Sequence, residues 1–157
     1  MNWRKALRLG LVDTEIQRVI DEEVVGGQAI DNAIDALIDS GVVQKTLTAL
    51  AAVDTAGGCA AWQNPETTKV VALPILVVTT VATGACTVDV GVAANGTTSS
   101  DTQIDGQDVN GATGVFAGTW KLVDENGGSN DWITVSKATG ATAGIVGKLV
   151  VIYAKYA

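Results

Sequence analysis

The spacing of apolar residues along the chain changes close to Gly41. Before this point, apolar residues recur every three or four positions, which is the period of an amphipathic helix. After it, they alternate with polar residues or form continuous β-branched runs, which favours strands. The pattern predicts a helical N-terminal segment (1–45) and a β domain (46–157). The predicted fold class is mainly β, an antiparallel β-sandwich of jelly-roll-like type with a short N-terminal helical segment.

The N-terminal segment is predicted to form three short helices separated by glycines. Thr14 and Gln17 fit a capping box at the start of the second helix, and Gly26 ends that helix. The third helix is predicted to run from about Gln28 to Ser40. Apolar stripes along these helices are formed by Trp3, Leu7, Leu11, Ile16, Ile20, Ile30, Ile34 and Leu37.

Charged residues flank these stripes. They are the basic Arg4, Lys5 and Arg8 in the first helix and the acidic Asp31, Asp35 and Asp39 in the third. Like charges four residues apart repel, so the aspartates are expected to face either water or a basic partner surface. Short helices cannot bury such stripes alone, so we expect the stripe residues to anchor the chain on a partner. Alternatively, the helices close one end of the sandwich as part of its own core.

The apolar stretch Val70–Ala93 is predicted to form a strand, a tight turn and a returning strand. Its first arm, Ile75–Val81, is mostly β-branched, which suits a packed strand. Gly84 lies in the turn and is free to adopt positive φ. In the returning arm, valines alternate with threonine, aspartate and glycine, which is the period of a half-buried antiparallel strand.

Further turn signals divide the rest of the chain. Asn-Gly pairs begin at Asn95, Asn110 and Asn126, and Thr97–Asn110 is predicted to be a polar loop. The spacing suits about seven or eight strands in a sandwich or jelly roll. The last strand, Ile145–Tyr156, is apolar on both faces, as is the first arm of the predicted hairpin. Such strands need cover from a neighbour, so we expect the protein to be an oligomer.

Charge and composition exclude several classes of partner. The chain has 17 acidic and 10 basic residues, a formal net charge of −7 and no histidine. Nucleic-acid binding is not expected, because phosphate contacts need lysine and arginine. No membrane span is expected either, since Pro74, Gly84 and several threonines interrupt the uncharged stretch Val70–Val88. The basic N-terminus lacks an uninterrupted apolar run, so we expect no signal peptide.

No pattern in the chain indicates a catalytic site, a cofactor or a metal centre, so we expect a protein that is not an enzyme. The loop Asp101–Asp108 holds three carboxylates, which are suitable ligands for calcium. Its spacing matches no calcium motif, so a solvated acidic loop is the preferred interpretation. Cys59 and Cys86 lack metal-binding spacing and are interpreted as buried thiols in preference to a disulfide.

Three runs of the β domain resemble small structural proteins of tailed bacteriophages. They are Trp62–Glu66, Val78–Asn110 and Trp132–Tyr156. The resemblance extends over about Trp62–Tyr156 and is to the jelly-roll modules of head decoration, head-fibre and related virion surface proteins. It implies a symmetric homo-oligomer, usually a trimer. It also implies a place on the outer surface of the virion, after assembly in the host cytoplasm.

Two functions from different classes agree with these features. The first is a structural virion protein, a capsid decoration or head-fibre subunit held on the major capsid protein or another virion protein by its N-terminal helices. The alternative is a receptor- or glycan-binding adhesin module of a tail or cell surface. In that case Trp62, Trp120 and Trp132 would form a sugar-stacking platform, although tryptophans in a sandwich more often lie in the core or at an interface.

Overall fold

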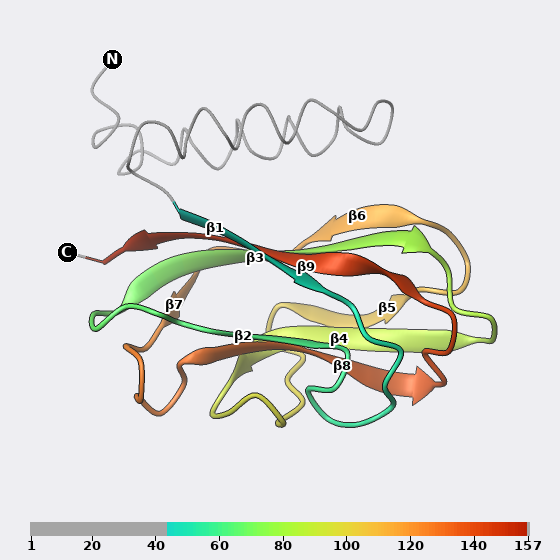
Figure 1. Cartoon of the computed structure of the whole chain (residues 1–157), viewed down its shortest axis with the longest axis horizontal. Helices are drawn as coiled ribbons and strands as arrows, with labels where there is room; N and C mark the ends of the chain where they lie inside the picture. Colours follow the sequence, from blue (N-terminus) through green and yellow to red (C-terminus); the bar gives the residue numbers. More distant parts are fainter. Residues whose placement is uncertain (1–43, 157) are drawn as a thin grey trace, which may run out of the picture. The chain divides into compact units, whose positions relative to one another are not determined.

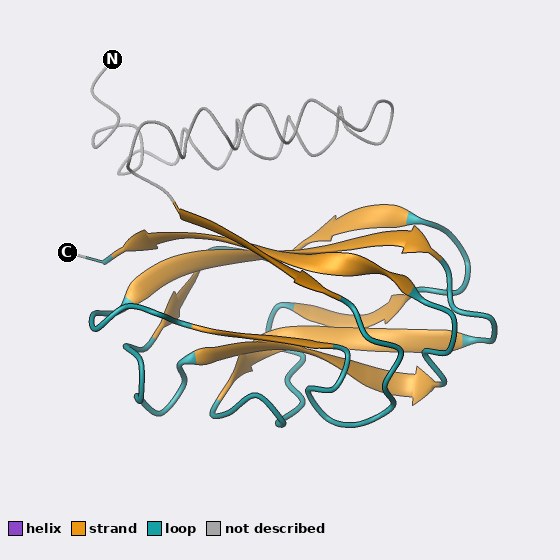
Figure 2. Ribbon diagram, viewed as in Figure 1, coloured by secondary structure: helices purple, strands orange, loops and turns teal. Residues whose placement is uncertain are grey.

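The computed structural model describes residues 44–156. In this range the chain consists of strands and loops and contains no helix (Figure 2). The strands are β1 (Gln44–Ala49), β2 (Ala60–Gln63), β3 (Val70–Thr80), β4 (Cys86–Ala93), β5 (Ile104–Asp108), β6 (Gly114–Ala117), β7 (Lys121–Val123), β8 (Trp132–Gly140) and β9 (Val146–Lys155). The predicted N-terminal helices and all their stripe residues lie outside the described residues.

The strands form two sheets that are stacked as two layers (Figure 1). Sheet A has the order β1-β9-β3-β6, with β7 also paired to β3, and sheet B has the order β2-β8-β4-β5. Every strand pair whose register is described is antiparallel. The prediction of a mainly β chain with two packed antiparallel sheets is therefore confirmed.

The hydrophobic core lies between the two sheets. Alternate residues of β3 and β9 point into it from sheet A, and alternate residues of β4 and β8 point into it from sheet B. Leu76 and Leu149 are paired across β3 and β9, and they are fully buried, as is Ile133 on β8. Trp62 packs on Tyr153 with the ring centroids 5.1 Å apart. This core joins the layers, so the sandwich does not depend on a disulfide among the described residues.

The two arms predicted around Gly84 correspond to β3 and β4, but they do not form a hairpin. β3 belongs to sheet A and β4 to sheet B, so the connection crosses from one layer to the other (Figure 1). Ala82 N donates to Val109 O and Thr83 N to Ala143 O, both at 2.9 Å. Gly84 does not adopt positive φ. The hairpin prediction is wrong because β9 and β6 occupy the two edges of β3 and leave none for β4.

The polar stretch predicted as a loop, Thr97–Asn110, contains the edge strand β5. Val90 pairs with Ile104 and Val88 with Gln107, with a register shift between them. The prediction missed this strand because a short edge strand can be polar and still pair through its backbone. The three Asn-Gly pairs do lie in turns or bends, as predicted.

Candidate functional site

The acidic loop uses its carboxylates to shape the backbone. Asp108 Oδ1 accepts hydrogen bonds from Asn110 N at 2.8 Å and from Gly111 N at 3.0 Å. Asp89 Oδ1, on β4, accepts one from Gly106 N at 2.9 Å. Among residues 44–156, no three acidic, cysteine or histidine side chains are placed to hold a metal ion. The geometry of the loop therefore supports a role in closing turns at the edge of sheet B.

The three tryptophans considered for sugar stacking differ in exposure. Trp62 is 6% exposed and belongs to the core, so its ring cannot stack on a sugar. Trp120 and Trp132 are half-buried. Trp132 lies against Gly96, where an added Cβ would come within 2.8 Å of the indole ring. Trp62 is thus a core residue, and the three side chains do not form one exposed platform.

Cys59 and Cys86 are free thiols buried in the core, which confirms the prediction from the sequence. Cys59 Sγ lies 3.4 Å from Val53 O. Burial raises the pKa of the Cys59 thiol and also that of the Cys86 thiol, because it disfavours the thiolate. Both groups are therefore protonated at neutral pH and behave as small apolar side chains.

A buried polar cluster at one end of the sandwich was not predicted from the sequence. Asn64 is fully buried just after β2, and Asp131 is 2% exposed just before β8. Asn64 N donates to Asp131 O at 2.8 Å, while Asp131 Oδ2 accepts bonds from Gln63 Nε2 and Gly127 N, each at 2.8 Å. The cluster connects the loop after β2 to the loop before β8. Its role is to hold these loops, and its members are far apart in sequence.

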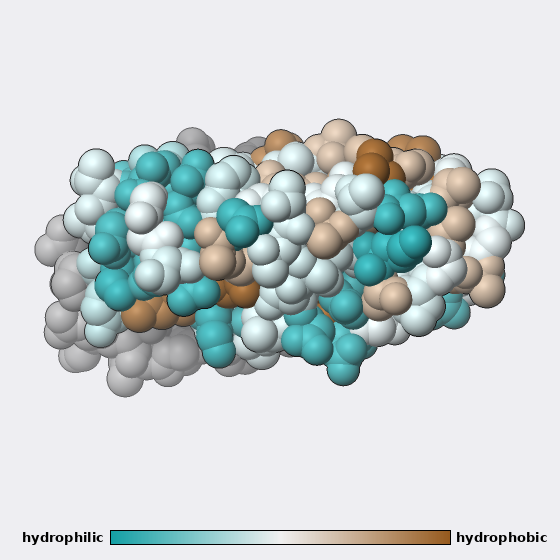
Figure 3. Space-filling model, turned by 90° about the horizontal axis from the view of Figure 1, so that it is seen from below, coloured by the Kyte–Doolittle hydropathy of each residue, from teal (hydrophilic) through white to brown (hydrophobic). Residues whose placement is uncertain are grey.

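The outer face of sheet B, which points away from sheet A, is polar. It carries Asp89 from β4 and Thr134 and Ser136 from β8. Thr134 Oγ1 donates to Thr98 O at 2.8 Å, and Gly57 N donates to Ser136 Oγ at 2.6 Å, so loops lie over this face. Figure 3 shows this side of the molecule as mainly hydrophilic and neutral residues, with small hydrophobic spots. Thr134 and Ser136 are fully buried beneath these loops, so the loops, and not these two strand residues, meet the solvent on this side.

The outer face of sheet A, which points away from sheet B, is apolar. Its centre consists of the cross-strand pairs Leu73–Ile152 and Ile75–Val150 of β3 and β9. Each of these four side chains is at most 5% exposed. Sheet A also carries a rim of exposed apolar side chains, namely Leu47 (53%), Leu122 (44%) and Val146 (53%). The two outer faces of the sandwich thus differ in chemistry, and the apolar one is the candidate interaction surface.

Comparison of the chain with protein-family models, with curated proteins and with solved structures finds no match. Within residues 44–156, no helix has the length and hydrophobicity needed to span a membrane. The candidate surface is therefore interpreted from its own residues and from the sequence patterns described above.

Proposed function

We propose that the chain is a structural protein of a tailed-bacteriophage particle, a capsid decoration or head-fibre subunit with a jelly-roll type of sandwich. In this proposal it is a homo-oligomer, with a trimer favoured, on the outer surface of the virion. Its N-terminal segment attaches it to the major capsid protein or to another virion protein. The observation that carries the proposal is the contrast between the polar outer face of sheet B and the apolar outer face of sheet A.

The rim of sheet A supports assembly with other subunits. Leu47, Leu122 and Val146 are about half exposed in a single chain. Fully burying an aliphatic side chain of this size contributes about 1.5 to 3 kcal/mol, so a contact that covers the rim is favourable. The polar face of sheet B would remain in water on the outside of such an assembly. A projecting virion subunit needs this division between a contacting face and a solvated face.

The oligomeric state is the first test. Light scattering of the purified full-length chain should give a trimer at micromolar concentration. Leu122→Asp combined with Val146→Asp should shift the protein to monomers, because carboxylates would be buried in the contact. Thr87→Asp, on β4 in sheet B, is the matched control and should leave the trimer intact. A wild-type chain that is monomeric at this concentration would contradict the oligomer.

Copy number per particle is the second test and separates the two functions. Quantitative mass spectrometry of purified virions should give a fixed ratio to the major capsid protein that matches sites on the capsid lattice. A few copies per particle, together with binding to a glycan array, would favour the adhesin module instead. Absence of the chain from purified virions would refute both virion roles.

A further inference from the structure

The three Asn-Gly pairs are the same dipeptide in three different surroundings. In such a pair the backbone nitrogen of the glycine can attack the side-chain amide carbon of the asparagine, because glycine has no side chain to hinder the approach. The attack needs a glycine nitrogen without another partner and an asparagine side chain that is not held elsewhere. Which of the pairs at Asn95, Asn110 and Asn126 reacts is therefore decided by the hydrogen bonds that the fold gives them.

The pair at Asn110 is held at both reacting groups. Gly111 N, the attacking atom, donates to Asp108 Oδ1 at 3.0 Å. The amide nitrogen of Asn110 donates to Ala82 O at 2.8 Å. The attacking nitrogen has to lose its proton, and a carboxylate beside it disfavours the negative charge that results. The fold therefore protects this pair.

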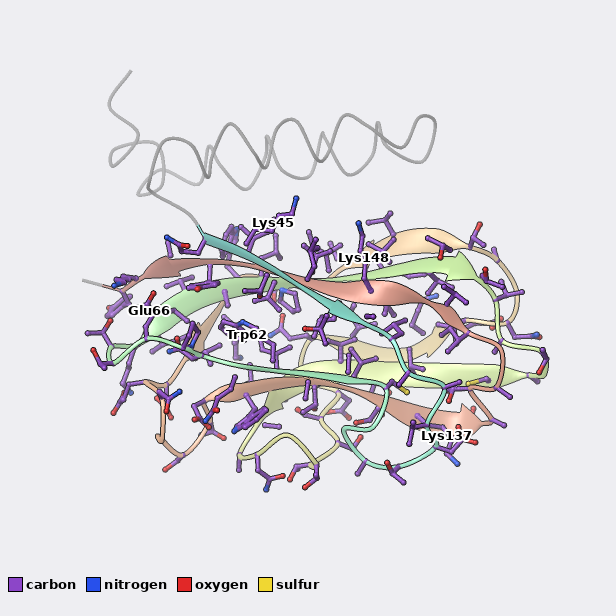
Figure 4. All side chains as sticks on the ribbon, viewed as in Figure 1. Lys45, Trp62, Glu66, Lys137 and Lys148 are labelled. Atoms are coloured by element: carbon purple, nitrogen blue, oxygen red, sulfur yellow. The ribbon has the colours of Figure 1, made fainter. Side chains whose placement is uncertain are left out.

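The pair at Asn126 is held in the same way, at the end of the sandwich where Glu66 lies (Figure 4). Asn126 N donates to Glu66 O, and Asn126 Nδ2 donates to Asn64 O, both at 2.9 Å. Gly127 N donates to Asp131 Oδ2 at 2.8 Å, so the attacking nitrogen again faces a carboxylate. This pair is protected as well.

The pair at Asn95, in the turn after β4, has the opposite arrangement. Among residues 44–156, neither Gly96 N nor the amide nitrogen of Asn95 has a hydrogen-bond partner. Asn95 Oδ1 instead accepts three bonds, from Thr97 N at 2.9 Å, from Thr97 Oγ1 at 2.8 Å and from Thr98 Oγ1 at 3.0 Å. Asn95 and both threonines are exposed, so water has access to the turn.

The three donors around Asn95 Oδ1 are placed as in an oxyanion hole. Negative charge develops on this oxygen when the nitrogen of Gly96 adds to the amide carbon, and donors already in position stabilise that charge. The backbone of Gly96 packs closely, since an added Cβ would come within 2.8 Å of the Trp132 ring. The fold thus keeps the glycine nitrogen next to an activated amide.

We propose that Asn95 is a site of spontaneous deamidation, which the fold selects over Asn110 and Asn126. Gly96 N gives up its proton and forms a bond to Cγ of Asn95. The bond from Cγ to Nδ2 breaks, and ammonia leaves with one proton, so that a cyclic imide remains.

One water molecule then opens the imide. Opening at the side-chain carbonyl gives an aspartate, and opening at the main-chain carbonyl gives an isoaspartate, in which the chain continues through the side chain. No oxidant or reductant takes part. Either product adds one negative charge to the turn after β4. This inference does not depend on the proposed function.

Peptide mass spectrometry of the full-length protein, stored in buffer of constant pH, tests the selection. In the folded protein, Asn95 should convert at least about tenfold faster than Asn110 or Asn126. In urea that unfolds the chain, the three rates should become similar, because the hydrogen bonds that distinguish the pairs are then lost.

Removal of the hydroxyl donors tests the activation. Thr97→Val combined with Thr98→Val should slow conversion at Asn95 by about tenfold, while the other two pairs keep their rates as internal references. Thr113→Val, at an exposed threonine in a different loop, is the matched control and should leave all three rates unchanged. Circular dichroism checks that each variant is folded, and Thr98→Val alone, with a smaller slowing, replaces the double variant if that one is not.

Three results would overturn the inference. The first is equal conversion of the three pairs in the folded protein. The second is a preference for Asn95 that persists in urea, since the fold would then not be its cause. The third is an unchanged or faster conversion at Asn95 in a folded variant that lacks the threonine hydroxyls. A monomeric protein, or a chain missing from virions, would contradict the proposed function and leave the deamidation unaffected.

Discussion

Replacing Asn64 with leucine should lower the free energy of unfolding by about 3 kcal/mol, because three partly buried hydrogen bonds from its side chain to the backbone would be lost. The Asn64 side chain is fully buried. Its Nδ2 donates to Asp124 O at 2.7 Å and to Thr68 O at 3.1 Å, and its Oδ1 accepts from Glu66 N at 3.0 Å. Leucine has a similar size but can make none of these bonds. Each orphaned group adds its own desolvation cost.

Thermal unfolding followed by circular dichroism measures this effect. The midpoint should fall by about 10 °C for a domain of this size. Asn130→Leu is the matched control, since Asn130 is an exposed asparagine in a nearby loop. That change should stay within about 0.5 kcal/mol of wild type. Equal midpoints for the two variants would mean that water replaces the Asn64 side chain at no cost.

Gly140→Ala should destabilise the protein by about 3 kcal/mol or more, through backbone strain and steric overlap together. Gly140 ends β8 with φ of 70°, in the left-handed region that disfavours other residues. A Cβ at this position would overlap the carbonyl oxygen of Ala85. Because this neighbour is backbone, the connection into β4 would have to move.

Gly106→Ala isolates the conformational part of this cost. Gly106 has φ of 62°, and an added Cβ would meet no atom within 4 Å. Alanine there should cost about 1 kcal/mol, which is the usual penalty for the left-handed region. Urea unfolding of the two variants gives the difference directly. If both lose the same free energy, steric overlap at Gly140 contributes nothing.

Local patterns in the sequence were sufficient to predict several strands of the fold. The alternation in the returning arm was confirmed, since Val88 and Val90 are fully buried in the core of β4. The predicted first arm, Ile75–Val81, overlaps β3, which starts five residues earlier at Val70 and ends at Thr80. The predicted last strand, Ile145–Tyr156, matches β9 to within one residue at each end. These predictions succeeded because side-chain period and β-branching are properties of neighbouring residues.

The candidate surface was predicted only in part. The sequence indicated that β3 and β9 are apolar on both faces, and the structure pairs Leu73 with Ile152 and Ile75 with Val150 on one of them. Which residues remain exposed at the rim depends on the strand order of sheet A. The stripe residues from Trp3 to Leu37 lie outside the described residues, so their anchoring role stays a prediction.

The polypeptide sequence alone established a β domain, its main strands, its Asn-Gly turns and two buried thiols. The layer in which each strand lies was decided in the tertiary structure, as β3 and β4 show by joining different sheets. The tertiary structure also decided the hydrogen bonds of the Asn64 cluster and the pairing of strand β5, neither of which was predicted from the sequence. The physical reason is that strand pairing and buried hydrogen bonds join residues far apart in the chain. A strand that is apolar on both faces does not itself specify its neighbours.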